Sequence, residues 1–190
     1  MPDVSASAQQ PPLADQFSAC SAEAAALAGL TETQGRWRPG PERWSVAECL
    51  AHLAATAREY EPGIVAAVRR VRALGKPAPG AFRPGWVGRR IVAAMEPAAG
   101  RRMRTTAALT PAAGVSLAEA ARAFEGAQAV LREALAEVEG LDLGSARVRS
   151  PVAPVLSLSL GTALLALAAH ERRHLAQARR VTEAPGFPAA

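Results

Sequence analysis

The segment Leu164-Leu-Ala-Leu-Ala-Ala-His170-Glu-Arg-Arg-His174-Leu-Ala-Gln177 is rich in leucine and alanine and has the composition of a helix throughout. Its two histidines are four positions apart, so on a helix both side chains project from one face and lie close enough to bind one metal ion. Apolar residues continue along or beside the same stripe, which predicts that this face is buried. The segment therefore indicates a helix that supplies both packing surface and candidate metal ligands.

The chain has one other histidine, His52, in a second helical stretch that runs from Ser45 to Thr56. A single histidine on an apolar helix face is more often a core residue than a metal ligand. Nevertheless, all three histidines of the chain fall in two strongly helical segments, which indicates one shared site. The candidate ligands are therefore His52, His170 and His174.

The composition of this 190-residue chain favours packed helices over sheet. Hydrophobic residues make up 49% and aromatic residues only 4%, and alanine has the highest helix propensity but little value on a pleated surface. A chain of this length can bury a core without disulfides or metal. The two cysteines, Cys20 and Cys49, have neither metal-site spacing nor a disulfide pattern. With reduced thiols and no secretory signal at the start of the sequence, we expect a cytoplasmic protein.

The charge pattern bears on the partners of the protein. The formal net charge is +5, and every basic residue except Lys76 is an arginine. The arginines are spread along the chain and mixed with glutamate, and the common nucleic-acid-binding signatures are absent from the sequence. The apolar run from Val155 to Ala169 is shorter than a membrane span and is interrupted by serine, glycine and threonine. We therefore expect no nucleic-acid partner and no membrane partner.

Four long helices are predicted, and two of them have clear start signals. The first covers roughly residues 13–29, and the second begins at the capping box Ser45-Val-Ala-Glu48 and runs to about residue 74. The third begins at a second capping box, Ser116-Leu-Ala-Glu119, and ends before Gly140. The fourth covers residues 159–182. This pattern predicts a disordered lead over residues 1–12, one helical domain over 13–183 and a flexible tail over 184–190.

Some forty residues rich in proline, glycine and arginine, from Lys76 to Val115, connect the second and third helices. A connection of this length is unnecessary for a tight antiparallel hairpin, so we expect it to cross over and leave the two helices parallel, with a short helix near residues 87–95. The predicted fold class is all-α, a four-helix bundle with a long crossover between helices two and three.

Two motifs together carry a family resemblance: Trp44-Ser45-Val-Ala-Glu48-Cys49-Leu50-Ala-His52-Leu53, and His170-x-x-x-His174-x-x-Gln177. The chain resembles the DinB and YfiT-like superfamily of metal-binding four-helix proteins in the order and spacing of most of its segments. The resemblance implies that residues 13–183 form a DinB-like domain. It also implies that His52, His170 and His174 bind a divalent metal ion, namely zinc, nickel or iron. The crossover departs from the family, and no substrate-binding residue can be transferred to it.

The resemblance also bears on activity. Some relatives are transferases or isomerases that use a low-molecular-weight thiol such as mycothiol or bacillithiol, which implies a thiol and a small electrophilic substrate as partners. Three neutral imidazoles leave a metal its full charge and an open coordination position, as in catalytic zinc sites. Hydrolysis by a metal-activated water and a non-catalytic metal-binding stress-response module are the alternatives. Four-helix domains with an exposed apolar stripe often pair, which is compatible with a homodimer.

The segment His170-Glu-Arg-Arg-His174 also fits the zinc-protease motif H-E-x-x-H, in which the glutamate acts as a base. That motif needs a third ligand downstream, and the sixteen residues after His174 contain no histidine. Glu183 is the sole carboxylate among them and is expected in the fraying end of the helix. A protease is therefore disfavoured. Glu171 lies about 100° around the helix from His170, and we predict that it faces solvent as a partner of arginines.

Several neighbours of the histidines are further candidates. Gln177 follows the histidine pair by one turn, where its amide would bond either a ligand or a buried backbone group. Glu59 is a better candidate than Glu48 to orient the ring of His52, because Glu48 belongs to the capping box; the alternative for Glu59 is a surface position. Cys49 is predicted to be a small buried thiol rather than a ligand.

Overall fold

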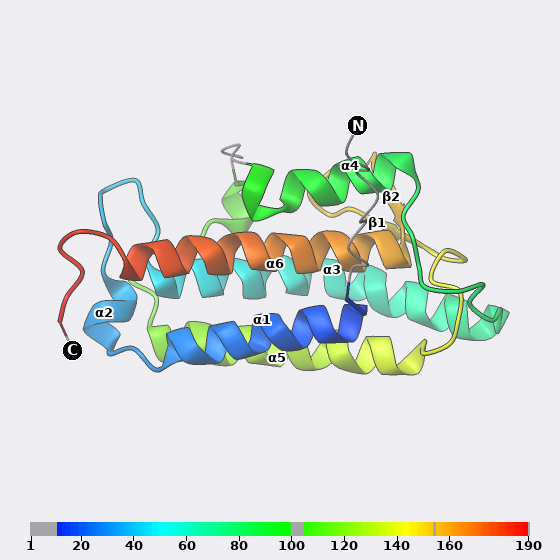
Figure 1. Ribbon diagram of the computed structural model, residues 1–190, viewed down its shortest axis with the longest axis horizontal. Coiled ribbons are helices and arrows are strands. Elements are labelled where there is room, and N and C mark those ends of the chain that lie inside the picture. Colours follow the sequence, from blue (N-terminus) through cyan, green and yellow to red (C-terminus); the bar gives the residue numbers. More distant parts are fainter. Residues whose placement is uncertain (1–10, 100–104, 154, 190) are drawn as a thin grey trace, which may run out of the picture.

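The computed structural model describes residues 11–99, 105–153 and 155–189, and within them it is a helical bundle with one two-stranded hairpin (Figure 1). The four long helices confirm the predicted all-α class. The hairpin was not predicted; it places Val148 opposite Leu158 in antiparallel register. In chain order the elements are α1 (Leu13–Ala28), α2 (Glu32–Arg36), α3 (Val46–Leu74), α4 (Trp86–Met95), η1 (Pro97–Ala99), η2 (Ala107–Leu109), α5 (Leu117–Glu137), β1 (Arg147–Arg149), β2 (Ser157–Ser159) and α6 (Leu160–Thr182).

The crossover between α3 and α5 is present. Figure 1 shows α3 and α5 running in one direction and α1 and α6 in the other. The contacts agree, because Arg72 near the end of α3 pairs with Glu137 at the end of α5. Just beyond these ends, Pro77 and Leu141 form an isolated antiparallel bridge. The connection therefore returns along the bundle, with α4 inside it, and the predicted parallel arrangement is confirmed.

The start of α3 follows its sequence signal. The hydroxyl of Ser45 accepts a hydrogen bond from the backbone N–H of Glu48, and the Glu48 carboxylate accepts one from the N–H of Ser45. Arg38 also pairs with this carboxylate. Two otherwise unpaired N–H groups of the first turn are satisfied in this way. His52, two turns farther along, is thus carried on a well-anchored helix.

The start of α5 forms only part of its predicted capping box. Ser116 accepts from the N–H of Glu119 as expected, but the carboxylate at this helix end belongs to Glu32 of α2. Glu32 accepts hydrogen bonds from the N–H groups of Leu117 and Ala118. The short helix α2, which the sequence analysis did not predict, therefore caps a helix some 85 positions downstream.

Helix α6 lies at the centre of the molecule, in contact with α1, α3 and α4. In Figure 1 it runs between α4 and α1, with α3 behind it. The close approach of α4 depends on Gly88, because a Cβ at this position would lie 3.0 Å from the side chain of Thr162. Helix α6 therefore has little open face, and most of its side chains meet another helix.

The two ends of the chain were predicted to be loosely held. Of the lead over residues 1–12, residues 1–10 lie outside the described residues. In the tail, the ring of Phe187 packs edge-on against Trp37 with centroids 5.6 Å apart, and Gln34 donates a hydrogen bond to the carbonyl of Pro188. The flexibility of the tail and the domain boundaries stay predictions.

Candidate metal site

The three histidines of the chain meet at one point between α3 and α6. His52 comes from α3, and His170 and His174 come from successive turns of α6. One ring nitrogen from each lies within 4.8 Å of the others, and the ring centroids are 4.5 to 5.1 Å apart. The predicted convergence of the three side chains is confirmed.

Hydrogen bonds fix which nitrogen of two of these rings faces the centre of the cluster. Nδ1 of His52 lies 2.8 Å from the backbone carbonyl of Leu109; a carbonyl only accepts, so Nδ1 carries the proton and donates it. In the same way Nδ1 of His174 donates to Oε1 of Gln177 at 3.1 Å. Each ring is thereby left with an unprotonated Nε2, the form in which imidazole binds a metal.

One nitrogen–nitrogen distance in the cluster matches that of a metal site, and all three candidate ligand atoms lie within 4.8 Å of one another. Nε2 of His52 and Nε2 of His170 are 3.2 Å apart. Two nitrogens bound at about 2.0 to 2.1 Å in a tetrahedral site would be separated by about 3.3 Å. The Nδ1 atom of His170 is buried and has no hydrogen-bond partner among the described residues, so the outer nitrogen of this ring is not held as those of His52 and His174 are. The donor set, three imidazoles from two rigid helices, fits a divalent first-row ion.

Burial keeps all three imidazoles neutral. Loss of hydration lowers the pKa of His52 below its usual 6.5 and lowers that of His170 well below this value, with a further contribution from the other two histidines. Burial, assisted by the charge of His52, lowers the pKa of His174 to about 3. Because only the neutral ring binds a metal, the site needs no deprotonation at physiological pH.

Trp44, directly before the first turn of α3, forms an aromatic wall of the cluster. Its ring centroid lies 4.8 Å from that of His52 and 5.7 Å from that of His174. His52 is 3% exposed, whereas His170, His174 and Trp44 are half-buried. The site therefore lies at the edge of the core and has an accessible side.

Glu171 is the clearest correction to the sequence analysis. It is 2% exposed rather than solvent-facing, and it faces Gln128 of α5 and Cys20 of α1. Burial raises its pKa to about 8, and burial next to Glu171 raises that of Cys20 to about 12. The prediction failed because α6 is covered by other helices on the side where solvent was assumed. Since Glu171 faces away from the histidines, it cannot act as the base of a protease-type site.

Three other neighbours of the histidines were also considered from the sequence, namely Gln177, Cys49 and Glu59. Gln177 bonds a candidate ligand, one of the two roles considered for it. Cys49 is a fully buried thiol whose pKa is raised by burial, as predicted. Glu59 is exposed, which is the second of the two roles considered for it, and the group that orients His52 is the Leu109 carbonyl. Leu109 had no sequence signal, because any residue supplies a backbone carbonyl.

Comparison with known proteins agrees with this arrangement. The family model described as the DinB superfamily matches residues 16–178, which include both histidine-bearing helices. No curated protein and no solved structure matches the chain significantly.

Proposed function

The chain belongs to the DinB superfamily, and from this premise we propose that it binds a divalent first-row metal ion through His52, His170 and His174. One observation carries the proposal: three neutral imidazoles converge on a single point, and hydrogen bonds to Leu109 and Gln177 leave Nε2 of two rings unprotonated. A buried histidine that serves only packing needs no such convergence.

We further propose that the site is catalytic and that its reaction transfers or isomerises a group with the help of a low-molecular-weight thiol. A divalent ion held by three neutral imidazoles keeps its full charge and an open coordination position, and when bound it would lower the pKa of a thiol or a water molecule. The choice of a thiol and a small electrophile as substrates rests on the resemblance to thiol-dependent members of the superfamily.

The residues of the chain itself have defined tasks in this proposal. Leu109 and Gln177 hold two rings in the metal-binding tautomer. Trp44 limits the space beside His52 and His174 and excludes water from that side. The half-buried edges of His170 and His174 leave one side from which a thiol can approach.

The test is elemental analysis of protein purified without a histidine tag, followed by activity screening. The double replacement His170→Ala with His174→Ala should remove the metal. Cys49→Ala, a matched buried position three residues before His52, should retain it. The metal-loaded protein is then assayed with low-molecular-weight thiols and small electrophiles.

The combined results of the metal analysis and the activity screen distinguish the candidate functions. Metal with thiol-dependent turnover supports the transferase or isomerase. Metal with thiol-independent hydrolysis of esters or amides favours a hydrolase, and metal without turnover in either assay favours a binding module. Absence of metal from protein purified and then incubated with zinc, nickel and iron overturns the proposal as a whole.

A further inference from the structure

The outward face of α4 has an unusual composition for a solvated helix. Its exposed residues are all either apolar, aromatic or arginine, and none is acidic or carries a hydroxyl or amide side chain. Trp86 is 66% exposed and Val87 is 55% exposed, while Gly88 and Val92 are buried on the opposite side against α6. The exposed residues are Trp86, Val87, Arg89, Arg90, Ala93 and Ala94.

The surrounding connection holds the entire net positive charge of the protein. Residues 76–116 contain seven basic residues and one acidic residue, a net charge of +6. The rest of the chain has the remaining 15 of 22 basic and 16 of 17 acidic residues, a net charge of −1. The single acidic residue of the connection, Glu96, is paired with Arg172 of α6. Three of the seven basic residues, at positions 101, 102 and 104, lie outside the described residues.

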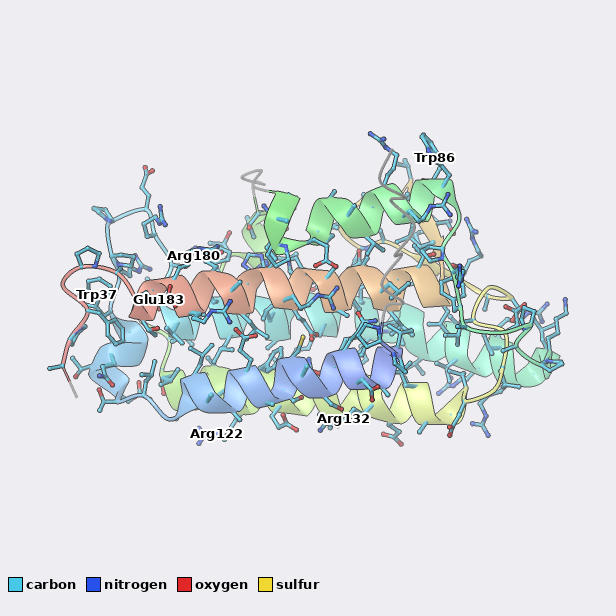
Figure 2. The ribbon with its side chains drawn as sticks, in the orientation of Figure 1. Trp37, Trp86, Arg122, Arg132, Arg180 and Glu183 are labelled. Atoms are coloured by element: carbon cyan, nitrogen blue, oxygen red, sulfur yellow. The ribbon has the colours of Figure 1, made fainter. Side chains whose placement is uncertain are left out.

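The described arginines on and just before α4 lack carboxylate partners among the described residues. In the part of the chain that the structure describes, Arg83, Arg89 and Arg90 make no ion pair with a carboxylate. Arg90 lies over the ring of Trp86 at 5.4 Å from its centroid, and Arg89 donates only a long hydrogen bond to the carbonyl of Pro84. Figure 2 shows Trp86 at the outer edge of the molecule, directed away from the bundle.

We propose that the outward face of α4 binds peripherally to the surface of an anionic lipid bilayer. Tryptophan favours the interfacial region of bilayers, and a basic helix face with tryptophan and aliphatic residues is typical of segments that lie in this region. Anionic headgroups attract each arginine near the surface. A nucleic acid fits less well, because contacts to sugar and phosphate also use hydroxyl and amide side chains, which this face lacks.

This proposal departs from the sequence-based expectation of no membrane partner, and it concerns a surface contact only. Among the described residues, no helix is long and apolar enough to cross a membrane. The proposal does not depend on the metal site, since the exposed residues of α4 supply none of the three candidate metal ligands.

Sedimentation with vesicles tests the proposal. The full-length protein should bind phosphatidylcholine vesicles that contain about one third phosphatidylglycerol and should not bind pure phosphatidylcholine vesicles. Binding should weaken as salt rises from about 0.1 M to about 1 M, where the Debye length falls from about 10 to about 3 Å. The double variant Arg89→Glu with Arg90→Glu should bind at least roughly tenfold more weakly, and Trp86→Ala should also weaken binding.

The matched control is Arg69→Glu with Arg70→Glu, the same charge change at an adjacent exposed arginine pair of α3. This control should retain most of the binding, and all variants should keep the wild-type helical content by circular dichroism. If a charge-reversal variant loses helicity, the glutamine versions of the same pairs replace it. Any of three results would overturn the proposal. They are an equal loss of vesicle binding in the Arg89/Arg90 and Arg69/Arg70 variants, equal binding of the protein to neutral and anionic vesicles, and binding to a DNA duplex that anionic vesicles do not displace.

Discussion

Two polar clusters lie on different sides of α6, and they differ in how their polar atoms are satisfied. On one side, His52 and His174 have hydrogen-bond partners on their outer nitrogens and direct their inner nitrogens toward a common point. On the other side, Glu171 faces Gln128 and Cys20. There, Glu171 Oε2 and both amide atoms of Gln128 have no hydrogen-bond partner of normal geometry among the described residues.

The comparison shows that burial of polar residues does not by itself make a functional site. Gln128 is fully buried and Glu171 nearly so, but their unpaired atoms do not converge with other donors, and they cost the fold free energy. The histidine cluster has lone pairs that converge and an accessible edge, which is the arrangement that a metal ligand requires. The first cluster should therefore control metal binding, and the second should control only stability.

The largest expected effect is on metal affinity. Replacement of either His170 or His174 by alanine should lower the affinity for the metal more than roughly 100-fold. Even substitution of a residue that only hydrogen-bonds a metal ligand typically lowers metal affinity about 10- to 100-fold. Helical content should stay intact, because a domain of this size folds on its apolar core. Metal stoichiometry and circular dichroism measure the two properties together. Full metal occupancy in the double variant would show that the ligands are misassigned, and loss of helicity would show that the metal is structural.

The next effect is a pH-dependent change in stability at Glu171. Burial raises its pKa to about 8 from the usual 4.5, so the folded state binds one proton more than the unfolded state between these values. The contribution of neutral Glu171 to the free energy of unfolding is therefore fully present below pH 4.5, and it is lost as the pH rises through 8. Glu171→Gln should therefore raise the free energy of unfolding by roughly 1 to 3 kcal/mol at pH 8 and change it little at pH 4.5.

Urea denaturation at the two pH values measures this difference, and Glu59→Gln, the same substitution at an exposed position, is the control. Metal content should be unchanged in both variants. A Glu171→Gln protein that is no more stable at pH 8 would contradict the assignment of a buried neutral carboxyl. If it kept its metal but lost turnover, Glu171 would instead take part in the reaction.

A large part of the fold, but less of the site, follows from the sequence. The capping box at Ser45 and the length of the connection after α3 predict where helices begin and that α3 and α5 are parallel, since both are local signals. The burial of Glu171 and the contact between Leu109 and His52 depend on which segments cover α6 and where the crossover lies. These are long-range packing outcomes with no local pattern, as is the use of Glu32 to cap α5.

A smaller effect is expected from paired glutamine replacements on the two sides of α6. Gln177→Leu removes the acceptor that orients His174 and should weaken metal binding about tenfold, with little change in stability. Gln128→Leu removes two unpaired buried amide atoms and should leave metal affinity unchanged while stability stays equal or increases. Titration with zinc and urea denaturation of both variants measure the contrast. Equal effects of the two replacements on affinity would show that the clusters are not independent.

The smallest effect is expected at Trp44, which contacts the histidine cluster without supplying a ligand. Its ring lies 4.8 Å from that of His52, so a metal-bound imidazole with increased positive charge should be stabilised by the indole face. Trp44→Ala should weaken metal binding roughly two- to fivefold, the size of a partly exposed cation–π contact. In a protein with Trp37 and Trp86 replaced by phenylalanine, fluorescence comes from Trp44 alone, and nickel should quench it while zinc should not. The control keeps Trp37 alone, and equal quenching by nickel in both proteins would show that the ion does not bind beside Trp44.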